Sequence, residues 1–172
     1  MFRKIQSFRN IKGFTLIELL MVIAIISILV SVIFTALNPL KRFKDSRDAK
    51  RWQEVLSILN AVIIDQIDNG GFYVEALSNL SPNRVYMVGT ATTGCDDKNA
   101  YCATEVDGDT YCIDLSLLIS ENYLGKIPVA PPGNTIWSTS ISGYTIERIS
   151  SGNISVRACE VEGSGGEISV TH

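Results

Sequence analysis

Glu18 is the only charged residue in a run of 24 residues, from Phe14 to Leu37, that is otherwise mostly apolar. A carboxylate costs about 2.5 to 3.5 kcal/mol near the centre of a segment that spans a bilayer. Acids that persist in such segments usually have a partner and a function. The position of Glu18 therefore predicts a functional contact with a specific partner.

Four cysteines lie in the second half of the chain, at Cys95, Cys102, Cys112 and Cys159. An even number behind an export segment predicts two disulfides. Three pairings are possible and spacing alone does not choose among them; we expect Cys95–Cys102 as a local loop and Cys112–Cys159 as a long-range bridge. The longer closure would contribute about 3 to 4 kcal/mol through the entropy of the unfolded chain.

Oxygen ligands for a cation are available at Glu105, Asp107 and Asp109, which alternate around Gly108. They fit no EF-hand spacing, so we expect a solvated turn, with calcium as the weaker reading and no other metal or cofactor. The only histidine is His172, which leaves no Ser/His/Asp or Cys/His set and predicts that the chain is not an enzyme.

Charge is segregated along the chain. Ten of the fifteen lysines and arginines lie in residues 1–51, whereas fifteen of the eighteen acidic residues follow Arg51. The acidic second half offers no footprint for nucleic acid, so direct nucleic-acid binding is not expected. The basic residues between Lys41 and Arg51 suit lipid headgroups or a contact between subunits.

These residues are positioned by a basic leader, a long helix and a head. Residues 1–13 carry four positive charges and predict a targeting segment. Residues 14–37 predict a membrane-spanning helix, and residues 40–69 an amphipathic helical spine that ends at Asn69-Gly70-Gly71. Pro39 predicts a kink or a short melted stretch around residues 35–39. Charge bias leaves the membrane orientation open, because the leader and the later basic residues favour opposite sides.

Short elements and turns fill residues 70–172, which predict an exported α+β head. Strands are expected at 84–88 and 167–171, a loop at 92–110 and a helix at 113–123. Residues 143–149 and 153–157 flank Ser150-Ser151-Gly152 and predict a hairpin. The expected architecture is an antiparallel sheet packed on the apolar stripe of the spine.

The stretch Lys12-Gly13-Phe14-Thr15-Leu16-Ile17-Glu18-Leu19-Leu20 resembles the class III signal of type IV pilins and pseudopilins. That signal combines a short basic leader, a glycine before the cleavage point, a phenylalanine after it and a glutamate at the fifth mature position. With the long apolar helix that follows, the resemblance covers residues 1 to about 69. It implies a type IV pilin-like fold, and the head resembles family heads in general layout only.

The resemblance also implies a maturation route. A prepilin peptidase would cut after Gly13 and methylate the new amine of Phe14, leaving the N-terminus cytoplasmic, the helix in the inner membrane and the head exported. An assembly platform and its ATPase would then build the subunits into a helical filament outside or across the envelope. In that filament Glu18 would pair with the Phe14 ammonium of a neighbouring copy.

Three functions remain open from the sequence. The first is a structural pilus subunit that serves adhesion, motility or DNA uptake. The second is a pseudopilin of a type II secretion or competence system. The third, of another class, is a membrane-tethered exported enzyme or binding protein, which the lack of a catalytic motif disfavours.

Overall fold

The computed structural model describes residues 13–73, 75–163 and 165–172. The predicted leader before Gly13 lies outside these residues. Chain contacts divide the protein into two compact units, residues 1–39 and 40–172. The whole of the predicted spine, residues 40–69, therefore belongs to the same unit as the head.

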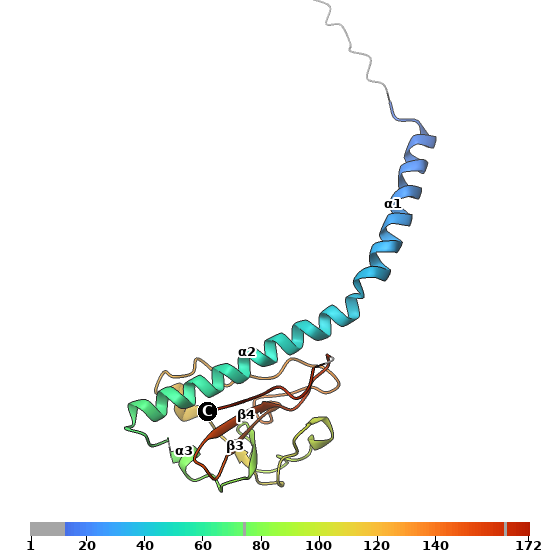
Figure 1. Cartoon of the computed structure of the whole chain (residues 1–172). Helices are drawn as coiled ribbons and strands as arrows, with labels where there is room; N and C mark the ends of the chain where they lie inside the picture. The colour runs from blue at the N-terminus through green and yellow to red at the C-terminus, as the bar shows by residue number, and fades with distance from the viewer. Residues whose placement is uncertain (1–12, 74, 164) are drawn as a thin grey trace, which may run out of the picture. The chain divides into compact units, whose positions relative to one another are not determined.

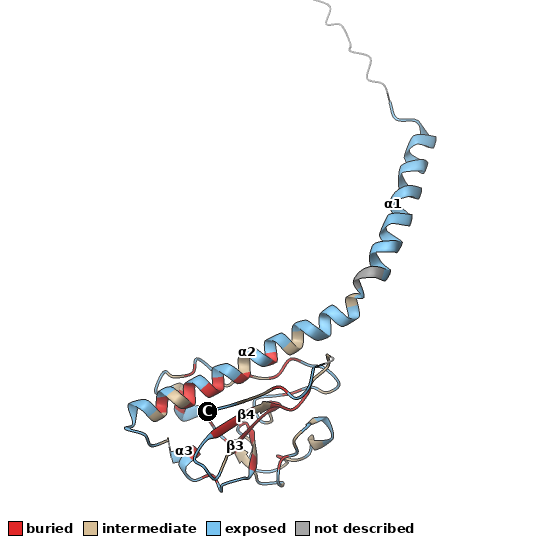
Figure 2. Ribbon diagram, in the orientation of Figure 1, coloured by how far each residue is buried: buried red, intermediate tan, exposed pale blue. Residues whose placement is uncertain are grey.

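The first unit contains helix α1, Leu16–Leu37 (Figure 1). Every described side chain from Gly13 to Thr35 is exposed, as the colouring of α1 in Figure 2 shows. The hydroxyls of Ser27 and Ser31 donate to the carbonyls of Ile23 and Ser27, at 2.7 and 2.8 Å. These polar groups are thus satisfied within the helix and can enter an apolar environment at low cost.

The helical path is interrupted at Asn38, between α1 and helix α2, Pro39–Asp68. Asn38 has a left-handed backbone with φ of 38° and ψ of 71°, a conformation that asparagine tolerates better than most residues. Pro39 occupies the first turn of α2, where its missing N–H costs nothing. The predicted kink is confirmed, but the break is narrower than the stretch 35–39.

Helix α2 forms one wall of the head. Val55, Ile58, Leu59 and Val62 recur at helical spacing and are buried in the same apolar core as the strands. In Figures 1 and 2 the buried part of α2 runs alongside β3 and β4. Gly71 has φ of 97° and donates its N–H to the carbonyl of Gln66 at 2.8 Å, which ends the helix as predicted.

A five-stranded sheet in the order β2-β1-β3-β4-β5 forms the rest of the head. Its strands are β1 Val85–Val88, β2 Cys112–Ile113, β3 Tyr144–Arg148, β4 Ile154–Ala158 and β5 Ser169–Thr171. β1 pairs antiparallel with β3, β3 with β4 and β4 with β5. β2 joins β1 in parallel, with Met87 opposite Cys112. The predicted antiparallel sheet is present, and β2 makes it a mixed sheet.

Smaller elements differ more from the prediction. The expected helix over 113–123 is reduced to α4, Ser116–Ser120, and Ile113 belongs to the sheet instead. A short helix, α3 at Glu75–Ser78, was not predicted. The expected loop 92–110 contains a 3₁₀ turn, Asn99–Tyr101.

The disulfide pairing expected from the sequence is wrong. The structure joins Cys95 to Cys112 and Cys102 to Cys159. Backbone contacts bring each pair together. β2 carries Cys112 to the edge of the sheet, and the N–H of Cys95 donates to the carbonyl of nearby Asp109 at 3.0 Å. The N–H of Ala103 donates to the carbonyl of Cys159 at 3.2 Å, so Cys159 lies beside Cys102 just after β4.

A buried ionic cluster fastens α2 to the chain that follows β4. Arg51 is fully buried and donates to Asp48 at 2.7 Å and to Glu162 at 2.9 Å. It also reaches Glu160 at 3.3 Å and the carbonyl of Pro131 at 3.0 Å. Arg47 forms a second, two-pronged contact with Glu162. The helix and the head are therefore joined by charges as well as by the apolar core.

Candidate assembly site at the start of the first helix

Glu18 lies in the first turn of α1, where Thr15 caps the helix. The Thr15 hydroxyl and backbone N–H both donate to Oε2 of Glu18, at 2.7 and 2.9 Å, and the Glu18 N–H donates back to Oγ1 of Thr15 at 3.3 Å. This is a reciprocal capping box, which stabilises a helix start and places the acid near the positive end of the helix dipole. Both hydrogen bonds that Thr15 donates go to Oε2 of Glu18, so Oε1 of Glu18 accepts none from Thr15.

The residues around the predicted cleavage point are open to solvent. Gly13 is exposed, and a Cβ at its position would meet no atom within 4 Å. The side chain of Phe14 is 84% exposed. The bond between these residues is thus accessible in the part of the chain that the structure describes.

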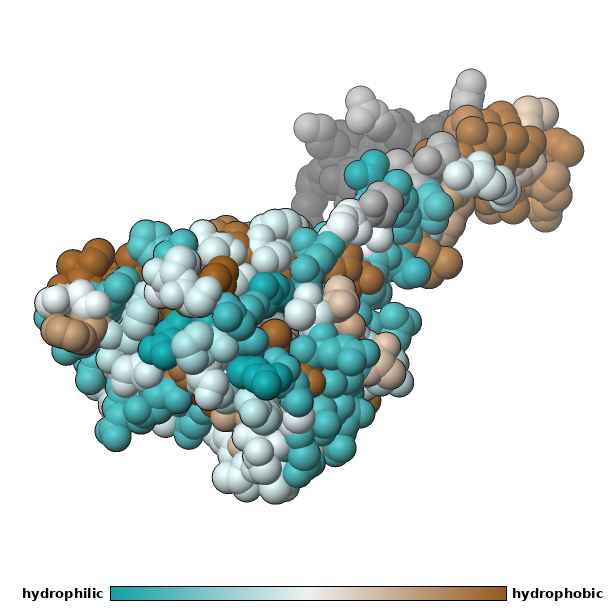
Figure 3. All heavy atoms as spheres, turned by 60° about the horizontal axis from the view of Figure 1, so that its bottom comes forward, coloured by the Kyte–Doolittle hydropathy of each residue, from teal (hydrophilic) through white to brown (hydrophobic). Residues whose placement is uncertain are grey.

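The apolar segment behind Glu18 is long enough to cross a bilayer. Leu16–Thr35 has 20 residues, none of them buried, and would extend about 30 Å as a helix. Figure 3 shows the contrast plainly, with a hydrophobic first helix and a head whose visible face is mostly hydrophilic. A segment so apolar and so exposed needs lipid or other protein chains around it.

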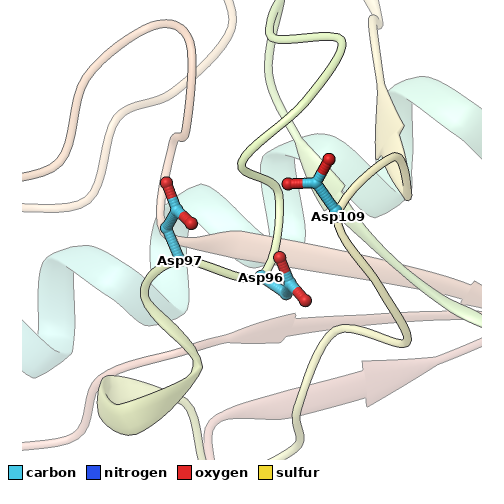
Figure 4. A group of neighbouring side chains, drawn as sticks. All are labelled: Asp96, Asp97 and Asp109. Carbon is cyan, nitrogen blue, oxygen red and sulfur yellow. The ribbon is translucent and has the colours of Figure 1, made fainter.

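The cation candidates of the sequence are brought together only in part. Asp109 lies with Asp96 and Asp97, their carboxylate oxygens within 4.8 Å of one another (Figure 4). Asp107 is used elsewhere, accepting from the N–H of Val85 and from Arg84, both at 2.7 Å. These two donors, the backbone N–H first, lower the pKa of Asp107.

The Asp96–Asp97–Asp109 group differs from the predicted set, because neither Glu105 nor Asp107 belongs to it. Asp109 also accepts from the N–H of Gly94 at 2.7 Å, which gives its carboxylate a role in holding the turn. Calcium binding stays a prediction from sequence.

The head offers no catalytic constellation among its described residues. Glu160 and Glu167 line a cavity of about 410 Å³ beside the Cys102–Cys159 disulfide. Glu160, however, is 3% exposed, and its carboxylate accepts hydrogen bonds from Arg51 and from the indole N–H of Trp137, each at 3.3 Å. His172 lies at the edge of the sheet, where its backbone pairs with Ile154.

Sequence reasoning missed the part that Arg47 and Arg51 play in the head. The sequence grouped both with the other basic residues from Lys41 to Arg51, as a face for lipid headgroups or another subunit. A signal was present, because Arg51 is four residues before Val55 and seven before Ile58, on the apolar stripe of the helix. A charged residue at a core position predicts an ionic partner in the rest of the fold.

A family model described as the prokaryotic N-terminal methylation motif matches residues 8–34. No curated protein and no solved structure matches the chain. The matched residues include Gly13, Phe14, Glu18 and most of α1. The motif implies processing by a prepilin peptidase and assembly with other pilin subunits, and it indicates a structural protein anchored in a membrane before assembly. The chain therefore carries the class III prepilin signal of type IV pilins and pseudopilins.

Proposed function

We propose that this chain is a structural subunit of a type IV pilus. It is cleaved after Gly13, methylated at the Phe14 amine, held in the inner membrane and built into a filament by an assembly platform and its ATPase. Polymerisation runs through the apolar helix, and Glu18 pairs with the Phe14 ammonium of the neighbouring copy. Adhesion, motility or DNA uptake would be the use of the finished filament.

The observation that carries the proposal is the complete exposure of the apolar segment Leu16–Thr35 behind a lone carboxylate. The serine hydroxyls of α1 are satisfied by its own carbonyls, so a bundle of such helices buries no unpaired side-chain donor at these positions. An uncompensated Glu18 in such a bundle would be costly, since breaking one side of a buried ion pair costs about 3 to 5 kcal/mol. A neighbouring ammonium removes that cost.

Helix α2 adds a second apolar surface that favours self-assembly. Leu56, Ile64 and Ile67 are 43%, 45% and 70% exposed on this helix. Their spacing places them on one side of the helix. Apolar residues on both faces of one helix suggest that the outer face is covered by other copies.

The capping box sharpens the test of Glu18. Glu18→Gln keeps a side chain that can close the capping box with Thr15 but removes the negative charge. We expect this variant to insert and to be cleaved normally, yet to fail to assemble. The matched control is Thr15→Ala, which loses the cap at a cost of about 1 kcal/mol and keeps the charge; it should assemble.

Assembly is measured as subunits recovered in sheared or pelleted filaments, with cleavage followed by the mass and N-terminal sequence of the mature protein. A methylated Phe14 terminus is expected in all variants. Filaments from Glu18→Gln at wild-type yield would contradict the pairing role, and a mature terminus near Leu37 would contradict the whole proposal. Mature subunits that stay in the envelope and never appear in surface filaments would favour a pseudopilin of a secretion or competence system.

A further inference from the structure

A groove of about 470 Å³ opens on the head between α2, α4 and the chain that links α4 to β3. Its apolar walls come from Ile119, Ile127 and Val129. The linking chain is held beside α2 by the hydrogen bond from Arg51 to the carbonyl of Pro131 at 3.0 Å. Clefts of this size with apolar walls are typical places for a protein to hold a ligand.

Residues 127–130 form an extended segment along one side of this groove. Pro128 and Ala130 are buried, whereas Ile127 and Val129 are half-buried and line the groove. This alternation is that of an extended chain, in which side chains two residues apart share a face. Pro128 adds to it, because the residue before a proline is pushed towards an extended backbone.

The backbone of this segment is paired along one edge only. The N–H of Ala130 donates to the carbonyl of Ser142 at 2.8 Å, and in an extended chain the polar groups of successive residues point to opposite edges. The N–H and C=O groups of Ile127 and Val129 therefore point away from Ser142. Within the described chain none of these four groups forms a hydrogen bond. An unpaired edge of this kind is a template for another strand.

One positive charge at the groove is not balanced by the head's own ion pairs. Five lysines and arginines follow Arg51. Four of them bind acids or carbonyls of the head: Arg84, Lys98, Arg148 and Arg157. The fifth, Lys126, is exposed, lines the groove and has no partner among the residues that the structure describes. A free lysine in an otherwise acidic head favours an anionic partner.

The other charged groups of the groove balance each other. Lys50 lies 3.7 Å from Glu54, whose carboxylate also accepts a hydrogen bond from the hydroxyl of Tyr144. Burial, and then the hydrogen bond to Glu54, raises the pKa of Tyr144, so this hydroxyl stays protonated and continues to donate. Glu54 is thus engaged by the head itself, and the net charge that the groove presents is that of Lys126.

We propose that this groove binds an extended peptide of another protein, in which apolar side chains alternate with polar ones that include an acid. The peptide adds a strand along Ile127 and Val129 and forms hydrogen bonds with their free N–H and C=O groups. Its apolar side chains enter the groove beside Ile119, and its carboxylate contacts Lys126. In this mode of binding the main-chain bonds give affinity and the pockets for alternate side chains give specificity. The whole groove lies within residues 40–172, so the inference does not depend on assembly of a filament.

Binding is tested with the full-length chain in nanodiscs of phosphatidylcholine, which keep detergent tails out of an apolar groove. A library of random seven-residue peptides is selected on this protein, and the recovered peptides are synthesised with a fluorescent label and titrated by anisotropy. We expect recovered sequences with apolar residues at alternate positions and an acid between or beside them. Selection that recovers no binding peptide, or only peptides without an acid, would overturn the proposal.

Two substitutions locate the bound peptide. Val129→Pro removes one N–H of the free edge and should weaken binding about tenfold, whereas Val129→Thr keeps the N–H and the branched shape and should stay within about twofold of wild type. Lys126→Glu should weaken binding about fivefold. Lys44→Glu is its control, since it reverses an exposed charge outside the groove. Unchanged binding in either Val129→Pro or Lys126→Glu would overturn the proposal.

Modified peptides repeat the test without altering the protein. Methylation of alternate amide nitrogens blocks one edge of the added strand, so methylation along one edge should abolish binding and along the other should spare it. Equal effects of the two methylation patterns would contradict strand addition. Crosslinks between two copies that Val129→Pro abolishes, in a chain that recovers no peptide, would assign the groove to a second copy and refute the peptide proposal.

Discussion

Arg51 on α2 donates to Glu162 across 111 residues of sequence, at 2.9 Å, with both side chains almost completely buried. The contact joins the helix to the segment between β4 and β5. Arg47 and Asp48 reinforce it, because Arg47 also binds Glu162 and Asp48 accepts from the N–H of Gly163 at 2.6 Å. Helix α2 is therefore held in the head by a segment that lies 111 residues further along the chain.

Replacement of Arg51 by methionine should destabilise the head by about 3 to 5 kcal/mol. The substitution leaves Asp48, Glu160 and Glu162 close together with Arg47 as the remaining nearby cation, and uncompensated buried charge has a cost of this size. Urea unfolding of the full-length chain in detergent, followed by tryptophan fluorescence, measures the change.

Lys50→Met is the matched control for Arg51→Met. Its side chain is 55% exposed and lies 3.7 Å from Glu54, so its loss should change the free energy of unfolding by no more than about 1 kcal/mol. Equal losses in the free energy of unfolding for the two substitutions would show that the buried cluster contributes no more than an exposed ion pair.

The same cluster should make the head sensitive to acid. Hydrogen bonds from Arg47 and then Arg51 lower the pKa of Glu162 from 4.5 to about 2. A lowered pKa in the folded state contributes stability that is fully present above pH 4.5 and is lost as the pH falls towards 2. At 1.36 kcal/mol per unit, the loss amounts to at most about 3 kcal/mol.

The pH dependence is checked by comparing wild type with Glu162→Gln from pH 7 to pH 2. Glutamine cannot titrate, so the variant should start less stable and lose less stability over the acid range. Other acids, such as Asp107, shift both curves alike. Parallel curves for the two proteins would contradict the assignment of the acid sensitivity to Glu162.

Local sequence signals predicted most of the architecture. The hairpin around Ser150-Ser151-Gly152 is present as β3 and β4, in almost the predicted ranges. The break before Pro39 and the helix end at Gly70-Gly71 were also found, because proline and glycine act on the backbone within a few residues. The first helix was predicted over residues 14–37 from its apolar run and is present as Leu16–Leu37.

Contacts between distant segments account for what was missed. β2 has two residues and no strand pattern of its own, and it exists through its parallel register with β1. That register fixes the partner of Cys112, which loop length could not choose. The partners of Arg51 come from residues 48, 131, 160 and 162, and no periodicity in one helix identifies them.

The disulfide pairing of the structure predicts which of the two bonds contributes more to the stability of the head. Cys102–Cys159 has a sequence separation of 57 and Cys95–Cys112 one of 17, so the loop model gives about 4 kcal/mol for the first and about 3 kcal/mol for the second. Replacing the first pair by alanine should therefore cost more than replacing the second. Non-reduced peptide mapping should find these two linked pairs, and a Cys95–Cys102 peptide would refute the register described for β2.

The turn after β1 should tolerate no side chain at Gly89. A Cβ there would lie 2.0 Å from the carbonyl oxygen of Ser140, and both partners are backbone, so relief requires separating β1 from the segment that precedes β3. Gly89→Ala should cost more than about 2 kcal/mol, as overpacking in a core does. Gly125→Ala is the control, because no atom lies within 4 Å of its added Cβ. Equal free energies of unfolding for the two variants would mean that the Gly89 and Ser140 backbones separate at little cost.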